Sequence, residues 1–278
     1  MTIKDLLESL KSAYSGERPN LVCEILLAHF LQKERIFLHA NADRKVADLM
    51  PDSTQTLQKS LLEAITLLND GYPLEYIIKK VSFYSQEFFI DSGALIPRPE
   101  TELLLDYALE TITKYNIKNI YEIGVGSGVI SIMLCLLKKD IKIVASDISQ
   151  SALNIARENI ALHSKQDSTL QSRISLVKTN LLDGITFPKH SLIISNPPYI
   201  ADSYAIPRNL SFEPRIALFG GENGDEILRK IIAIDADFLC CEIGYNQGYL
   251  KQNLGAYKSV RFYKDYAGFM RGFVASKI

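Results

Sequence analysis

Residues 196–199, Asn-Pro-Pro-Tyr, follow an apolar run, 191–195, that is typical of a buried strand. The prolines lack an amide proton and keep the preceding residue extended, so nearby carbonyl oxygens stay free as acceptors. The Asn196 side-chain oxygen and the Pro197 carbonyl can each accept one proton of a planar NH2 group, and Tyr199 can stack on such a group. The motif predicts a site that orients an NH2 nitrogen. Taken alone, it also fits a proline turn that ends a strand beside a core tyrosine.

An NH2 group conjugated to a carbonyl or a ring is a poor nucleophile because its lone pair is delocalised. Once alkylated, the nitrogen is cationic and sheds a proton easily, so no general base of matched pKa is required beforehand. The acceleration then comes mainly from alignment and electrostatic placement. On this argument the predicted catalytic residues are Asn196, Pro197 and Tyr199, and the predicted substrate-binding residues are Asn196, Pro197, Pro198 and Tyr199.

A glycine-rich loop, residues 122–128, closes another expected strand and would let the backbone approach a ligand. A dinucleotide-binding loop reads G-x-G-x-x-G, but here the third glycine, Gly128, comes one residue early. Glu122 precedes the loop and would repel a pyrophosphate, yet it suits a ligand with an ammonium and a sulfonium. S-adenosylmethionine is such a ligand. Three glycines also occur in ordinary strand-to-helix turns, so the loop needs support from elsewhere.

Asp147 supplies that support at the end of the next strand, where a carboxylate can accept both ribose hydroxyls of a nucleoside. The alternative is an acid that favours the start of the following helix. Loop and acid together favour a cofactor site. The predicted cofactor-binding residues from these motifs are Glu122, Gly124, Val125, Gly126, Ser127, Gly128, Asp147 and Asn196.

Helical and strand patterns alternate from about residue 98 onward. This alternation predicts an α/β fold with a doubly wound, mostly parallel, Rossmann-like sheet, whose ligands gather at the carboxyl ends of its strands. Each motif above falls at such an end. The expected strands are 119–123, 141–146, 174–178, 192–195, 238–243 and two at the end of the chain, and the expected helices are 100–113, 128–138, 151–162, 225–234 and 247–254.

The N-terminal third differs in pattern. Residues 2–5 resemble a capping box, Pro19 is placed to start a second helix, and residues 51–70 predict a third. Residues 76–96 are rich in β-branched and aromatic residues and predict a hairpin. We therefore divide the chain into a helical domain (1–72), a hairpin linker (73–97) and a methyltransferase domain (98–278).

Composition limits the partners. The 278 residues carry a formal net charge of -1, which disfavours duplex DNA as the main partner, and no nucleic acid is expected. The four cysteines lie in apolar stretches without metal-ligand spacing, so we expect reduced core thiols and no metal site. No apolar run reaches membrane-spanning length, and the N-terminus does not read as a signal peptide. We expect a cytoplasmic monomer.

With these residues assembled, the chain resembles the protein-(glutamine) methyltransferases (PrmC/HemK family) that modify the Gly-Gly-Gln loop of peptide-chain release factors. The linker 96–101, Ile-Pro-Arg-Pro-Glu-Thr, is the most specific match, because Asn-Pro-Pro-Tyr is shared with adenine-amino methyltransferases. The resemblance covers nearly the whole chain through segments 71–76, 95–102, 122–128, 196–200 and 212–224, together with Asp147.

The resemblance implies transfer of a methyl group from S-adenosylmethionine to the glutamine side-chain amide of class 1 release factors, in translation termination. It implies that the helical domain and hairpin dock the release factor. It also implies that Asn180 and Leu181 bind the cofactor, although Asn180 stands where the family usually has an acid near the adenine. A second departure is the sequence 235–237, Asp-Ala-Asp, in place of a glycine turn.

Three rival functions are open at this point. The nearest is an adenine-amino (N6) methyltransferase acting on nucleic acid, which the near-neutral charge disfavours. A catalytically inactive binding module is disfavoured by the intact Asn196 and loop. A dehydrogenase is disfavoured by the missing third fingerprint glycine.

Overall fold

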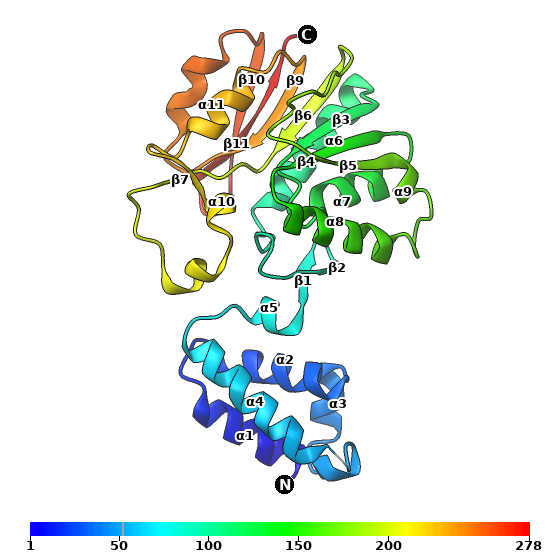
Figure 1. Ribbon diagram of the computed structural model, residues 1–278, viewed down its shortest axis with the longest axis vertical. Helices are drawn as coiled ribbons and strands as arrows, with labels where there is room; N and C mark the ends of the chain where they lie inside the picture. The colour runs from blue at the N-terminus through cyan, green and yellow to red at the C-terminus, as the bar shows by residue number, and fades with distance from the viewer. Residues whose placement is uncertain (52) are drawn as a thin grey trace. The chain divides into compact units, whose positions relative to one another are not determined.

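The computed structural model describes residues 1–51 and 53–278 (Figure 1). It divides into two units, one of residues 1–79 with 207–212, and one of residues 80–206 with 213–278. No helix in these described ranges has both the length and the apolar character needed to cross a membrane.

The first unit is helical. The predicted capping box is present, since the Thr2 hydroxyl accepts the Asp5 N–H at 3.1 Å and the Asp5 carboxylate accepts the Thr2 N–H at 2.9 Å. Pro19 starts a helix as predicted. The helix predicted over 51–70 is observed as Thr54–Asn69, and position 52 lies outside the described residues. The elements are α1 (Ile3–Ala13), α2 (Pro19–Leu31), α3 (Arg35–Ala40), η1 (Val46–Asp48), α4 (Thr54–Asn69), α5 (Leu74–Ile78) and η2 (Arg208–Phe212).

The predicted hairpin is present but shorter than 76–96. Strands β1 (Lys80–Phe83) and β2 (Gln86–Phe89) pair antiparallel. Tyr84 and Ser85 between them have φ of 51° and 59°, as a tight two-residue hairpin turn requires. Tyr76 lies instead in α5, because Pro73 caps that helix at its N-terminus.

The second unit is built on a seven-stranded sheet of order β10-β11-β9-β6-β3-β4-β5. The strands from β9 to β5 run parallel. At one edge β11 pairs antiparallel with β9, and β10 pairs antiparallel with β11. The predicted Rossmann-like sheet is therefore confirmed. The strands are β3 (Asn119–Ile123), β4 (Lys142–Asp147), β5 (Ile174–Lys178), β6 (Ser191–Ser195), β9 (Phe238–Glu242), β10 (Ser259–Lys264) and β11 (Met270–Ser276).

Helices cover both faces of this sheet (Figure 1). Leu192 and Ile194 of β6 belong to the core cluster that includes α6, α7 and α8, whereas Ile193 belongs to the cluster that includes α11 and η3. Cys240 and Cys241 likewise belong to opposite clusters, and the four cysteines are buried free thiols, as predicted. The helices are α6 (Thr101–Tyr115), α7 (Val129–Leu137), α8 (Gln150–His163), α9 (Leu170–Arg173), α10 (Arg215–Leu218), α11 (Glu226–Ile232) and η3 (Gly248–Leu254).

The structure adds elements that the sequence pattern did not predict. The most important are β7 (Ile200–Ala201), which directly follows residues 196–199, and β8 (Phe219–Gly221), which pairs parallel with it. The helix predicted over 247–254 is a 3-10 helix.

Candidate active site

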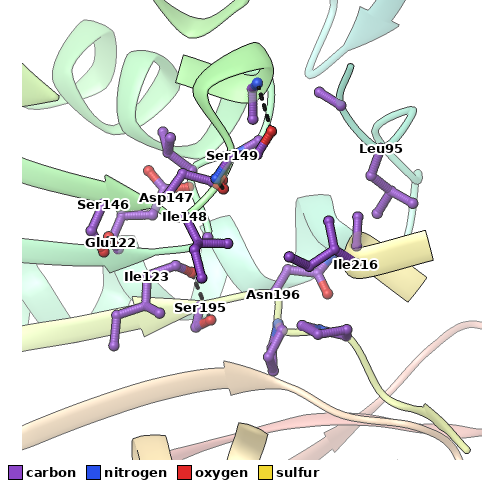
Figure 2. Close-up of a pocket in the computed structure, with 18 of the residues that line it drawn as sticks. Leu95, Glu122, Ile123, Ser146, Asp147, Ile148, Ser149, Ser195, Asn196 and Ile216 are labelled. Atoms are coloured by element: carbon purple, nitrogen blue, oxygen red, sulfur yellow. Dashed lines mark hydrogen bonds between the residues drawn. The ribbon is translucent and has the colours of Figure 1, made fainter. Parts of the chain in front are cut away.

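A pocket of about 230 Å³ lies at the carboxyl ends of β3, β4 and β6. A single water takes about 30 Å³, so the space fits a sizeable ligand. Figure 2 shows Asp147, Ile148 and Ser149 on one side of it and Asn196 with Ile216 on the other. The sequence-predicted site residues that line it are Glu122, Gly124, Val125, Gly126, Ser127, Asp147, Asn180, Leu181, Asn196, Pro197 and Pro198.

Two predicted site residues, Gly128 and Tyr199, are not among the described residues that line the pocket. Gly128 caps α7, and a Cβ there would lie 3.3 Å from the Ala156 Cβ, so this glycine permits α7 and α8 to pack closely. Tyr199 directs its hydroxyl to Glu242. Both residues therefore contact the scaffold of the pocket in this structure.

The glycine loop is held to the neighbouring strand. The amides of Gly124 and Val125 donate to the Ser146 carbonyl at 2.9 and 3.0 Å. Gly124 and Gly126 have φ of 75° and 54°, a left-handed backbone that favours glycine. The backbone of the loop thus lines the pocket beside β4.

Asp147 ends β4 beside this loop. Its Oδ2 accepts the Gly126 amide proton at 3.0 Å, and its Oδ1 accepts the Ser149 amide proton at 2.8 Å. Each carboxylate oxygen has two acceptor positions, so both can still accept a hydroxyl from a ligand. Burial raises the pKa of Asp147 above its usual value.

Glu122 is a second acid in the pocket and is only 1% exposed. The Ser131 hydroxyl donates to it, and burial raises its pKa to about 8. Two carboxyl groups whose pKa values are both raised by burial would be stabilised as anions by a cationic ligand. The pocket therefore fits the ammonium and sulfonium of S-adenosylmethionine.

Asn180 and Leu181 follow β5 and complete this side of the pocket. Leu181 has a φ of 50°, which is costly for a branched side chain and is found mostly where function or packing demands it. The backbone of Thr179 is tied to β4 by its N–H bond to the Asp147 carbonyl at 3.1 Å. The turn is thus fixed to the strand that carries Asp147.

Asn196 lies beside the loop because β6 and β3 are neighbours and the Ser195 hydroxyl donates to the Ile123 carbonyl at 2.8 Å. Its side-chain NH2 donates to the Thr101 hydroxyl at 3.0 Å. No donor to its Oδ1 occurs among the described residues, so that oxygen is available as an acceptor. Its role as the acceptor for a substrate NH2 group stays a prediction.

Glu242, at the end of β9, is 1% exposed and was missed by the sequence analysis. Its Oε2 accepts the Thr101 hydroxyl at 2.8 Å, and its Oε1 accepts the Tyr199 hydroxyl at 3.4 Å. Burial raises its pKa to about 7, and burial also raises the pKa of Tyr199. An acid that closes an otherwise apolar strand was the available sequence signal.

The backbone of residues 196–199 is supported from the side of β8. A Cβ on Gly220 would lie 2.4 Å from the Pro198 carbonyl, so only glycine allows this approach. Gln247, also missed, is 2% exposed and donates to the Gly224 carbonyl at 2.9 Å and the Tyr199 carbonyl at 3.3 Å. These contacts fix the motif between β7–β8 and the segment after β9.

The linker motif is held by an ion pair. The Arg98 guanidinium donates to Glu213, and the Glu213 carboxylate also accepts the Ile96 N–H at 3.0 Å. Glu213 is 6% exposed. Arg98 lies three residues before Thr101, so its ion pair with Glu213 places the start of α6 at the pocket.

Comparison with known proteins shows the family to which the chain belongs. Residues 3–78 match the PrmC N-terminal domain family, and residues 99–210 match the methyltransferase small domain family. A protein of Dictyoglomus turgidum named release factor glutamine methyltransferase is 42% identical over 217 residues, covering 77% of this chain and 72% of its own. The chain belongs to the release factor glutamine methyltransferase family. It is an S-adenosylmethionine-dependent methyltransferase.

Other relatives of this family extend the match. The release factor glutamine methyltransferase of Clostridium acetobutylicum is 30% identical and covers 96% of this chain and 95% of its own. Among solved structures, the hMettl16 catalytic domain in complex with MAT2A 3'UTR hairpin 6 has a TM-score of 0.55 at 15% identity, covering 80% of this chain and 82% of that one. At that identity the likeness concerns the fold alone.

Proposed function

We propose that this methyltransferase modifies the side-chain amide nitrogen of the glutamine in the Gly-Gly-Gln loop of class 1 release factors. The observation that carries the proposal is the Asn196 amide, whose NH2 is engaged by Thr101 and whose oxygen is left as an acceptor at the pocket. An acceptor suits a substrate that presents N–H groups. The family to which the chain belongs supports glutamine as that substrate.

Some residues of the pocket would bind the cofactor and others would bind the substrate amide. When bound, S-adenosylmethionine supplies a methyl group activated by its sulfonium. Asp147 would accept its ribose hydroxyls, Glu122 would balance its positive charge, and the turn at Asn180 and Leu181 would face the adenine. Asn196 and the Pro197 carbonyl would each accept one amide proton of the glutamine and hold its nitrogen in line.

The proposal extends to partners and location. The helical domain (1–72) and the hairpin linker (73–97) would dock the release factor, and the methyltransferase domain (98–278) would carry the reaction. A single glutamine side chain offers few contacts, so affinity needs such a wider surface. We place the enzyme in the cytoplasm, as a monomer acting in translation termination.

Mass spectrometry tests the proposal directly. The chain is incubated with isotope-labelled S-adenosylmethionine and a class 1 release factor, a Gly-Gly-Glu variant of that factor, or adenine-containing nucleic acid. We expect one methyl group on the loop glutamine and none on the Gly-Gly-Glu variant, because a carboxylate offers no N–H to Asn196. Label on nucleic acid, or on another release-factor residue, would contradict the proposal.

A further inference from the structure

A buried chain of polar side chains runs behind Asn196. Its NH2 donates to the Thr101 hydroxyl at 3.0 Å, and that hydroxyl donates to Glu242 Oε2 at 2.8 Å. Thr101 begins α6 and Glu242 ends β9, so two regular elements hold the chain in place. Thr101 is 3% exposed and Glu242 is 1% exposed, so bulk water does not compete for these bonds.

The positions of the protons in these two hydrogen bonds determine which way the Asn196 amide is turned. An ionised carboxylate only accepts, so Thr101 must give its single hydroxyl proton to Glu242. The hydroxyl oxygen then offers Asn196 only lone pairs. The amide must therefore turn its NH2 toward Thr101, and its oxygen is left for the pocket.

The same carboxylate also contacts the end of the motif. The Tyr199 hydroxyl donates to Glu242 Oε1 at 3.4 Å. Glu242 is thus linked to Asn196 through the Thr101 hydroxyl and contacts Tyr199 directly. A buried carboxyl group costs free energy relative to an apolar side chain, so a role in orientation accounts for an acid at the end of β9.

We infer that Thr101 and Glu242 are positioning residues, which hold the Asn196 amide with its oxygen toward the NH2 group of the substrate. The inference rests on the proposed function, because an NH2 substrate is what needs an acceptor there. With the amide reversed, the Asn196 NH2 would meet the substrate NH2 as donor against donor. The substrate nitrogen would then lose its alignment while the pocket itself stayed intact.

Substitutions at Thr101 test the first bond. Thr101→Val keeps the shape but removes the hydroxyl, and Thr101→Ser keeps the hydroxyl. The matched control is Thr111→Val, on the same helix, where the buried hydroxyl donates to the Tyr107 carbonyl at 2.8 Å. The readouts are single-turnover methyl transfer to release factor, the KM for release factor, and the calorimetric Kd for S-adenosylmethionine.

We expect Thr101→Val to lower the single-turnover rate about 10- to 100-fold, as misalignment of a reacting group does. The Kd and KM should not change, Thr101→Ser should restore the rate, and Thr111→Val should match the wild type. A normal rate in Thr101→Val would overturn the inference. So would a loss of S-adenosylmethionine affinity equal to the loss of rate, because Thr101 would then act as a ligand contact.

Glu242→Gln tests the second bond through a double-variant cycle. If Glu242 acts through Thr101, this substitution lowers the rate in the wild-type background but adds nothing in the Thr101→Val background. Fully additive losses would overturn the relay and leave Glu242 acting through Tyr199 alone.

Nuclear magnetic resonance gives a readout that needs no release factor. The side-chain NH2 signal of Asn196, assigned by its loss in Asn196→Ala, should move in Thr101→Val and stay in place in Thr111→Val. An unmoved signal in Thr101→Val would overturn the inference even if transfer to release factor failed altogether. Failure of methyl transfer in every variant, with the signal moving as expected, would instead count against the proposed function alone.

Discussion

Asp147 binds two backbone amides of the site and still has acceptor positions free on both oxygens. We expect Asp147→Ala to weaken S-adenosylmethionine binding by about 1.5–3 kcal/mol, the worth of hydrogen bonds to a charged group. Calorimetry measures this, with the exposed Asp183 changed to alanine as the control. An unchanged affinity in Asp147→Ala would remove this carboxylate from the cofactor site.

Asn196 holds the substrate amide in our proposal, whereas Asp147 and Glu122 are assigned to the ribose and the positive charge of the cofactor. Asn196→Ala should therefore leave S-adenosylmethionine affinity largely intact and lower turnover by orders of magnitude. Asn196→Asp should also be poor, because a carboxylate cannot donate to Thr101 and adds a charge beside the sulfonium. Near-normal single-turnover rates in both variants would show that Asn196 does not align the substrate nitrogen.

Glu242 brings a pH dependence to the same step. Its pKa is raised to about 7, so it is largely protonated below pH 7 and ionised above it. Only the ionised form obliges Thr101 to donate, so the single-turnover rate should rise between pH 6 and pH 8. In Glu242→Gln the rise should flatten, and a rise of equal size there would assign it to another group. The other titratable or charged groups that act on Glu242 are Glu100, Tyr199, Tyr263 and Arg271.

At the scale of elements, the β7–β8 pair forms the support of residues 196–199. Gly220→Ala would drive a Cβ to 2.4 Å from the Pro198 carbonyl, so the motif must shift. We expect a loss of kcat of about 100-fold, since a displacement near 1 Å has that effect on an aligned reaction. Gly255→Ala is the matched control, because its φ is -61° and nothing lies within 4 Å of its added Cβ. Equal activity of the two variants would show that the β7–β8 pair does not hold residues 196–199 in their active position.

The hairpin is packed into the core of the second unit. Phe83 and Phe88 are fully buried in the same core cluster as α7 and α8. The Asn159 side chain accepts the Phe89 N–H at 2.7 Å and donates to its carbonyl at 2.8 Å. A linker role alone does not explain these contacts, because they bind the hairpin into the catalytic unit.

At the scale of the whole molecule, the two units allow their roles to be separated. A fragment of residues 80–278 keeps the hairpin core and the pocket, so we expect it to bind S-adenosylmethionine as the full chain does. It should methylate release factor poorly, with the loss in KM, because the helical-domain part of the proposed docking surface is missing. Calorimetry and steady-state kinetics of the two proteins measure this, and an unchanged KM would refute docking by the helical domain.

The sequence by itself determined the local parts of this protein. The capping box at Thr2, the strand-loop-helix around residues 122–128 and the proline-held motif at 196–199 all follow from residues close together in the chain. The alternation of strands and helices was enough to place the motifs at one edge of a parallel sheet. Local structure that depends on neighbours in sequence was therefore predictable.

Tertiary structure decided what depends on distant residues. Thr101 and Glu242 are 141 positions apart and Thr101 and Asn196 are 95 apart, so no local pattern encodes their hydrogen bonds. The packing of Gly128 against Ala156, and the turning of the Tyr199 hydroxyl toward Glu242, were hidden for the same reason. Side-chain orientation in a buried site is set by whichever partners the fold brings into contact, and those partners come from elements far apart along the chain.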